Sequence, residues 1–344
     1  WLAVSGRLLS MGSTGGDVIS HLVSGDMVRR ELRDLNAFHG RTVARLMQGP
    51  EAAAGFSVRD RDGVVHLVAL LDHNRKRITD VMRPIEETVP SSAYLELAHH
   101  VIETGLSVDG IENLCGLVRD SEGQLHSLFE LPQDLDLSSP VVFHGPYAIS
   151  LPRMLRSTSD FILMGMKFLA MPEHLEIRGN ADFTECEFDG IPDGSTFHED
   201  LSITSSTIQR LPRGLFVGRW LKMRGTSIDT LPGSIRVGVG IDAEDSGLRI
   251  VPPGFELAGD LRISGSSVRR LVGVRIGGSL YIERMVSPEL ADDCEIGGNI
   301  YADTFPCSLS GHLAGKTFVR TQFGYERPTP ERDVGCVSPQ DYDL

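Results

Sequence analysis

Four histidines occupy matched places in the first third of the chain and could provide metal ligands. They form two pairs at an offset of sixty residues, His39 with His99 and His66 with His126. Imidazole is the commonest transition-metal ligand, so two copies of one unit could bring the rings together. No H-x-x-x-H spacing and no carboxylate at ligand spacing accompanies them, which favours structural histidines copied by a duplication. We expect no metal and no cofactor.

Nucleophilic catalysis has no recognisable signature in this sequence. A catalytic Ser or Cys needs an oriented base, yet neither a nucleophile elbow nor a catalytic-cysteine motif is present. The glycines between Gly12 and Gly16 lack the Gly-Lys-Ser/Thr ending of a phosphate-binding loop. Five widely spaced cysteines without a C-x-x-C pair indicate reduced thiols. The sequence therefore favours binding over catalysis, and we assign no catalytic residue.

The charge of the chain limits its partners. Its 33 Lys and Arg residues against 47 Asp and Glu residues give a formal charge of −14. Because nucleic-acid affinity depends largely on cationic side chains, we expect a protein partner and no nucleic acid. Apolar runs such as Leu67–Leu71 are far shorter than the roughly 20 residues that span a bilayer, so we expect a soluble protein with no membrane span.

A period of twenty residues runs through the second half of the chain. An apolar residue followed by Pro marks it at Leu131-Pro132, Leu151-Pro152, Met171-Pro172, Ile191-Pro192, Leu211-Pro212, Leu231-Pro232 and Val251-Pro252. Between these pairs apolar residues alternate, as in Leu221 and Met223, which is typical of a strand with one buried face. Proline lacks the backbone donor and ends the strand. We expect one short strand and one short return segment per repeat.

A column of small side chains accompanies the repeat. Its members are Cys186, Ser206, Thr226, Ser246 and Ser266. At a turn position such side chains can bond the backbone of the next coil, and we interpret the column as an internal hydrogen-bond ladder.

The complete unit, L-x-I-x-x-[ST]-x-I-x-x-L-P, resembles the short leucine-rich repeats of bacterial proteins, with Ser, Thr or Cys in place of the usual Asn. It is similar in particular to the arrays of bacterial effectors secreted into host cells, whose solenoids recognise host proteins or hold an attached enzyme in check. The resemblance implies a curved, β-rich leucine-rich-repeat solenoid with one short strand per repeat. It covers roughly half of the chain.

The repeat pattern divides the chain into five parts. We expect a loosely ordered segment at 1–20, a mixed α/β domain at 21–130, the solenoid at 131–304, a C-terminal cap at 305–323 and a tail at 324–344. Solenoids need such atypical end units to cover their open cores.

The mixed domain is expected to contain two copies of a helix followed by a hairpin. The expected elements are a helix at 27–48, a hairpin at 56–71, a helical stretch at 76–105 and a hairpin at 113–130. Val58–His66 and Val118–His126 match at the same offset of sixty, each with an acidic residue and Gly at the turn. This match indicates a duplication.

The outward-facing side chains of the repeat strands form the candidate binding site. Alternation directs every second side chain away from the core, and successive coils stack these side chains into columns on an exposed sheet. Trp, Tyr and Arg are enriched at binding hot spots. The candidate partner-binding residues are Asp200, Trp220, Lys222, Arg224, Asp242, Glu244, Asp260, Arg262, Tyr281 and Tyr301. A related column, Asp160, Asn180, Asp200 and Asp260, favours a cationic or polar partner.

The sequence therefore predicts a protein–protein interaction module that binds a partner on the exposed sheet of the solenoid. The resemblance implies a role as a bacterial virulence effector. We expect a cytoplasmic location, or secretion into a host cell if the protein is such an effector. One alternative is an enzyme or regulatory module at 21–130 that the repeats target. Another is a self-assembling structural scaffold, since an uncapped solenoid end can stack on a second copy. The oligomeric state stays open.

Overall fold

The computed structural model of the protein describes residues 17–35, 54–72, 74–84, 87–285, 288–304, 311–321 and 324–327. The chain divides into two compact units, Trp1–Pro152 and Arg153–Leu344, and each has its own internal packing. None of the helices described is long and apolar enough to cross a membrane.

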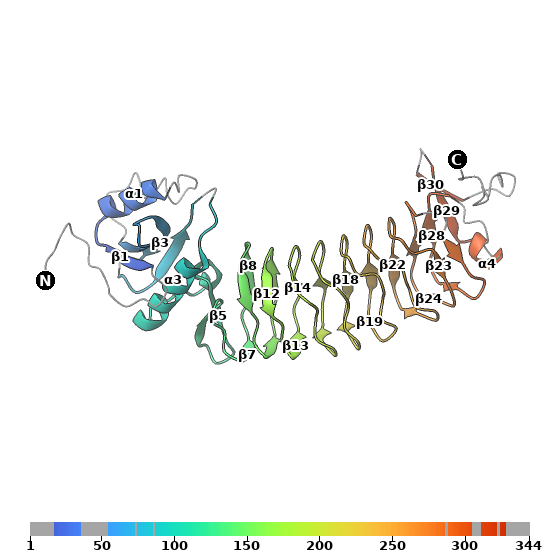
Figure 1. Cartoon of the computed structure of the whole chain (residues 1–344), viewed down its shortest axis with the longest axis horizontal. Coiled ribbons are helices and arrows are strands. Elements are labelled where there is room, and N and C mark those ends of the chain that lie inside the picture. The colour runs from blue at the N-terminus through green and yellow to red at the C-terminus, as the bar shows by residue number, and fades with distance from the viewer. Residues whose placement is uncertain are drawn as a thin grey trace. The chain divides into compact units, whose positions relative to one another are not determined.

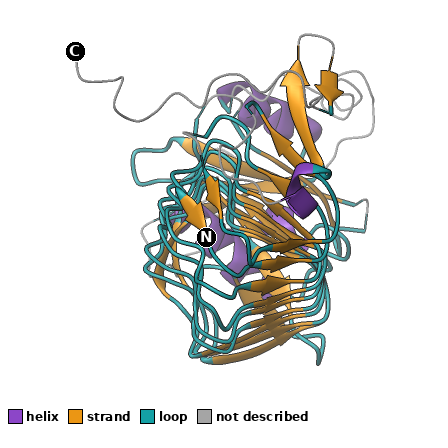
Figure 2. Cartoon of the chain, turned by 90° about the vertical axis from the view of Figure 1, so that its right-hand side faces the viewer, coloured by secondary structure: helices purple, strands orange, loops and turns teal. Residues whose placement is uncertain are grey.

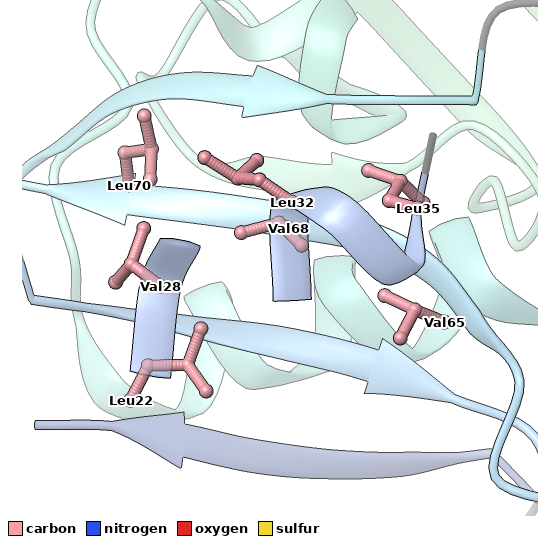
Figure 3. Packing of buried hydrophobic residues seen from close by; sticks show 7 residues of the cluster. All are labelled: Leu22, Val28, Leu32, Leu35, Val65, Val68 and Leu70. Carbon is pink, nitrogen blue, oxygen red and sulfur yellow. The ribbon is translucent and has the colours of Figure 1, made fainter. Parts of the chain in front are cut away.

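The first unit contains a four-stranded antiparallel sheet in the order β1-β2-β3-β4. Its strands are β1 (Val18–Leu22), β2 (Gly55–Arg59), β3 (Val65–Leu71) and β4 (Ile78–Met82). Helix α1 (Gly25–Asp34) begins after Ser24, whose hydroxyl accepts the Met27 amide at 3.4 Å. Figure 3 shows Val28 and Leu32 of this helix packed over Val68 of the sheet, all at most 1% exposed. Burial of these apolar groups holds α1 on the sheet.

A second helix and a second hairpin complete this part of the first unit. Helix α3 (Ser91–Thr104) buries Tyr94 and Leu97 and ends at Gly105, whose φ of 65° is left-handed. The 3₁₀ turn η1 (Glu112–Cys115) then leads into a hairpin. Its strands are β5 (Leu117–Arg119) and β6 (Leu125–Ser127).

The helical stretch predicted at 76–105 is only partly helical. Its first third is strand β4, and helix α3 covers its second half. Pro84 and Pro90 separate the two elements, because proline does not continue a helix through its own position. The predicted helix at 27–48 begins as α1, while 36–53, including His39, lies outside the described residues.

The two hairpins matched by sequence share their turn geometry in detail. Asp60 Oδ1 accepts the amides of Asp62 and Val64 at 3.0 and 2.9 Å, and its Oδ2 lies 3.3 Å from His66 Nε2. Asp120 Oδ1 accepts the equivalent amides, two and four residues on, at 3.0 and 2.8 Å, and its Oδ2 lies 2.8 Å from His126 Nε2. Duplicated side-chain hydrogen bonds support the predicted repeat of the hairpin.

Replacing Asp120 with Ala is expected to lower the free energy of unfolding by about 1 kcal/mol, because two turn amides and His126 lose their acceptor. Burial tends to raise the pKa of Asp120, but bonds from His126 and the turn amides outweigh it and leave the pKa below its ordinary value. Its contribution is therefore present above the unfolded pKa and is lost as pH falls through the folded one. Urea unfolding at several pH values measures the free energy of unfolding of Asp120→Ala and of the unmodified chain.

Asp120→Asn is the control, because it keeps the Oδ1 acceptor. It should retain more stability than Asp120→Ala and lose the dependence on acid. Equal loss of stability in both variants would contradict the turn geometry.

The first coil of the repeat lies at the end of the first unit. It consists of β7 (Asp134–Leu137), β8 (Val141–His144) and β9 (Ala148–Ser150). The second unit opens with the same sequence of three strands, β10 (Met154–Ser157), β11 (Phe161–Met164) and β12 (Lys167–Ala170).

Coils of the second unit stack through parallel sheets, as the successive strands in Figures 1 and 2 show. One sheet runs through β10, β13 (His174–Ile177), β15 (Thr196–Phe197), β17 (Phe216–Val217) and β19 (Arg236–Val237). The long sheet runs through β11, β14 (Ala181–Asp182), β16 (Leu201–Ser202), β18 (Trp220–Lys222), β20 (Gly240–Asp242), β22 (Asp260–Arg262), β25 (Leu280–Tyr281) and β28 (Ile300–Ala302). Shorter ladders join β21 (Glu256–Leu257), β24 (Arg275–Ile276) and β27 (Glu295–Ile296), and join β23 (Arg270–Leu271) to β26 (Glu289–Leu290).

The predicted class, a β-rich repeat solenoid with a mixed α/β N-terminal region, is confirmed. Leu221, Met223, Ile228 and Leu231 of one coil are all 0% exposed, as the alternation and the apolar-Pro pair predict. The coils nevertheless carry more than the one strand expected. After the corner the return segment stays extended and pairs with its neighbours, as at Glu187 and Thr207, because its own apolar residues face the same core.

The column of small side chains is buried, but its bonds differ along the solenoid. Ser206 links two coils, since its hydroxyl donates to Phe183 O at 2.5 Å and accepts the Cys186 amide at 3.0 Å. Thr226 and Ser246 instead donate to the carbonyl three residues earlier in their own coil, at 2.8 and 2.6 Å. The predicted ladder between coils is therefore only partly present.

One coil is a residue shorter than the others. Leu261 pairs with Leu280, although in the other coils of this sheet partners such as Leu221 and Ile241 are twenty residues apart. The missing residue falls in the turn at 271–274, where the apolar-Pro pair is also lost. Gly273 in this turn has a left-handed φ of 59°, and Gly194, Gly214 and Gly254 are also left-handed in the full-length coils, so the turn keeps its left-handed glycine despite the missing residue.

A different arrangement closes the C-terminal end of the solenoid. Helix α4 (Gly311–Ala314) buries Leu313 completely, and β29 (Thr317–Thr321) continues the long sheet parallel to β28. Strand β30 (Gly324–Glu326), which falls in the predicted tail, is antiparallel to β29 and ends the parallel stacking.

Candidate interaction surface

The predicted site residues lie along one face of the long sheet, in or next to the strands from β16 to β28. Their strands are in register, so that Lys222, Asp242, Arg262, Tyr281 and Tyr301 follow one another from coil to coil. Their side chains point away from the core and most are half-buried. We call this surface the outward face. It comprises the ten predicted residues together with Phe318 of β29, which pairs with Tyr301.

A continuous stack of rings and one guanidinium crosses the outward face. The guanidinium of Arg262 lies 4.9 Å from the ring centre of Trp220 and 5.0 Å from that of Tyr281. Tyr281 stacks on Tyr301 with ring centres 4.7 Å apart and planes inclined by 15°. Tyr301 stacks in turn on Phe318 at 5.9 Å. We call these five residues the stacked column. Cation–π and aromatic contacts hold its members in defined orientations.

Glycine at position 240 gives the indole of Trp220 its place in the stack. Trp220, Gly240 and Asp260 are register partners on three successive strands. A Cβ on Gly240 would lie 2.7 Å from the nearest indole carbon, so only a residue without a side chain lets the ring lie across this coil. The indole thereby reaches Arg262, two coils further on.

Most charges on this face are paired with one another. Lys222 Nζ lies 2.7 Å from Asp200, and Arg224 lies 3.3 Å from Glu244 and 3.7 Å from Asp242. Such half-exposed pairs contribute little to stability, but they neutralise the charges that a partner would meet.

The acidic column predicted to attract a cationic partner has a structural role. Asp160 Oδ1 accepts the amide of Asn180 at 2.7 Å, Asp200 Oδ1 that of Trp220 at 3.2 Å, and Asp260 Oδ1 that of Ser279 at 2.8 Å. Each carboxylate therefore holds the backbone of the following coil at the corner before the strand. In the structure these carboxylates connect successive coils through hydrogen bonds. This structural role makes a cationic partner less well supported.

Sequence reasoning missed the residues that extend the stack into the cap. Tyr325 of β30 meets Tyr301 edge-on at 5.0 Å and donates its hydroxyl to the carboxylate of Glu283, which is 8% exposed. This hydrogen bond is the main reason why the pKa of Tyr325 rises to about 12. Arg327 lies 5.2 Å above the ring of Phe318. No repeat signal could have found these residues, because β29 and β30 lie beyond the repeats.

At the described positions the matched histidines contact carboxylates, and the cysteine thiols are buried. His66 and His126 each contact the aspartate of their own hairpin, and His99 lies 2.9 Å from Glu130. Among the described residues no group of three or more His, Cys, Asp or Glu could hold a metal ion. Burial raises the pKa of Cys115 to about 12 and that of Cys186 to about 11, so both thiols stay protonated.

An open groove of about 790 Å³ lies along the ladder of β21, β24 and β27, but its cations are already engaged. Arg275 binds Glu256 at 2.7 Å, Lys316 donates to the carbonyl of Ile296, and His312 lies 3.2 Å from the carbonyl of Cys294. The three basic side chains of the groove are therefore engaged by acceptors of this chain.

Three comparisons with known proteins, against family models, curated proteins and solved structures, each found no match. The resemblance to leucine-rich repeats therefore depends on the repeat pattern alone. One fold serves many functions, so only the side chains of the outward face can indicate what this solenoid binds.

Proposed function

We propose that the protein is an interaction module that binds a protein partner on the outward face. The stacked column carries this proposal. Trp, Tyr and Arg dominate binding hot spots, and here Trp220, Arg262 and Tyr281 are already held in one arrangement. Side chains ordered before binding lose little entropy when a partner arrives.

The dimensions and charge of the face favour a protein over a small molecule or a nucleic acid. Parallel strands lie about 4.8 Å apart, so the six rungs from Lys222 to Phe318 extend for about 24 Å, a length suited to a protein interface. The surface is an open sheet face, whereas small-molecule sites are concave. The formal charge of −14 and the paired cations disfavour a polyanionic nucleic acid.

A role as a bacterial effector that acts in a host cell remains a proposal implied by the repeat resemblance. The self-assembling scaffold gains no support, because antiparallel β30 and helix α4 follow the last coil where a second copy would have to stack.

Alanine at Trp220 and Tyr281 is expected to weaken partner binding about 30-fold or more, the usual effect of losing a hot-spot residue. Affinity capture with the full chain as bait, quantified by mass spectrometry, checks this by comparing Trp220→Ala/Tyr281→Ala with the unmodified chain.

Phe216→Ala is the matched control, since Phe216 is an exposed aromatic residue, 38% accessible, on the other long ladder of the same unit. A protein retained by the control and lost by the double variant supports the proposal. If every captured protein binds the double variant equally well, the outward face is not the binding surface.

A further inference from the structure

Arg262 differs from the other cations on and beside the outward face. Lys222, Arg224 and Arg284 each have a carboxylate oxygen within 4.0 Å, at 2.7 Å from Asp200, 3.3 Å from Glu244 and 2.6 Å from Asp245. Within the described part of the chain, Arg262 has no such carboxylate and no hydrogen-bond acceptor. It is a cation with its charge uncompensated by a direct partner.

The surroundings of Arg262 hold its guanidinium in place. The group lies between the rings of Trp220 and Tyr281, and its Nε is buried without a hydrogen-bond partner. The two terminal nitrogens of the guanidinium, unlike Nε, are not fully buried. The neighbouring carboxylates are directed elsewhere, since Asp242 accepts the Glu244 amide and Asp260 accepts the Ser279 amide. The guanidinium of Arg262 is therefore held in one orientation and partly shielded from water, while its terminal N–H groups remain accessible.

We infer that Arg262 receives a side-chain carboxylate from an acidic peptide segment of the partner. This inference rests on the proposed function and names the chemistry of the partner. A guanidinium pairs with a carboxylate through two parallel hydrogen bonds, and stacking between rings orients its plane in advance. Partial removal of water strengthens such a pair, and the uncompensated charge makes a carboxylate the complementary group.

The acidic column alone would favour a cationic partner, whereas Arg262 favours an acidic one. Those aspartates brace the coils, while the exposed edge of the stacked column offers one positive group between apolar rings. The matching peptide carries Asp or Glu next to apolar or aromatic residues. Because the whole chain is strongly negative, its long-range field repels an acidic peptide; salt screens this repulsion, so binding should not weaken steeply as salt is raised.

A displayed library of random twelve-residue peptides, selected on the full chain, tests the inference. Selections on Arg262→Gln and on Arg236→Gln run in parallel. Arg236 is an exposed arginine of strand β19 on the other long ladder, so its substitution makes the same change of charge away from the stack. We expect Asp or Glu to be enriched on the unmodified chain and on Arg236→Gln, and the enrichment to vanish on Arg262→Gln.

A double-mutant cycle then tests the pair directly. The strongest selected peptide is synthesised with its acidic residue and with the matching amide, Glu→Gln or Asp→Asn, and both are titrated calorimetrically. On the unmodified chain the amide peptide should bind about tenfold or more weakly. On Arg262→Gln the two peptides should bind alike, because the partner of the carboxylate is gone.

The outcomes separate this inference from the proposed function. Selected peptides that need Trp220 and Tyr281 but carry no acidic residue would overturn the role of Arg262 and leave the interaction module standing. Peptides unaffected by Trp220→Ala/Tyr281→Ala would overturn both. Displacement of the acidic peptide by a single-stranded oligonucleotide, with a steep loss of affinity on raising salt, would point to phosphate as the ligand and also overturn the inference.

Discussion

Replacing Gly259 with Ala is expected to lower the free energy of unfolding by about 3 kcal/mol. A Cβ at this position would lie 1.5 Å from the carbonyl oxygen of Val239 and 2.4 Å from its carbonyl carbon, both in the preceding coil. That oxygen cannot rotate away without loss, because it accepts the amide of Asp260 at 3.1 Å. The two coils would have to separate at the corner, which would weaken the ladder on both sides.

Urea unfolding of the full chain, followed by circular dichroism, measures the loss. Gly233→Ala is the control, since the nearest atom to its Cβ would be 4.0 Å away and its φ lies outside the left-handed region. This control should be neutral or slightly stabilising, because Ala restricts the unfolded chain more than Gly does. Equal stability of the two variants would mean that the coils are not as close at this corner as the structure has them.

Truncation of Phe183 to Ala is expected to lower the free energy of unfolding by about 3–5 kcal/mol. Phe183 is 0% exposed and contacts three other rings inside the solenoid. Its ring centre lies 6.1 Å from that of Phe161, 5.5 Å from Phe168 and 6.2 Å from Phe188. Removing the central ring leaves a cavity between coils that the rigid backbone ladders on either side prevent from closing.

The same chemical change at Phe216 provides the control for this prediction. Its ring is 38% exposed, so Phe216→Ala should reduce stability by less than about 1 kcal/mol. Both variants are compared by urea unfolding of the full chain, with the slope of the transition checked for constancy. If both substitutions reduce stability by similar amounts, the aromatic cluster is not the centre of these coils.

Much of the solenoid follows from two periods in the sequence. Alternation by two places Leu221 and Met223 in the core, and recurrence by twenty places Leu221 beside Ile241. Both results need only short-range geometry, because an extended strand exposes alternate side chains on opposite faces. The duplicated hairpins were equally visible, since Asp60 and Asp120 bond amides only two and four residues away.

The secondary structure of the return segments was harder to predict. The return segment alternates over only a few residues, and its extended pairing at Glu187 and Thr207 arises only when a neighbouring coil provides the partner. The predicted helical stretch at 76–105 was wrong in its first third for a similar reason, because β4 forms there by pairing with β3, whereas α3 covers its second half. Propensity is a weak guide where a partner strand decides the backbone.

The sequence by itself determined which side chains of this protein lie inside and which lie outside, and so placed Trp220, Arg262 and Tyr281 on one face. Only the tertiary structure decided what each outward side chain does there. Lys222 meets Asp200 at a separation of 22 residues, Arg284 meets Asp245 at 39, and Tyr325 meets Glu283 at 42. Such pairs depend on the rise, twist and corner geometry of stacked coils, and on Gly240, whose missing side chain lets one indole cross a coil. Those quantities come from the packing of the whole core, which is why the difference between a paired cation and the unpaired Arg262 could not be predicted from the sequence.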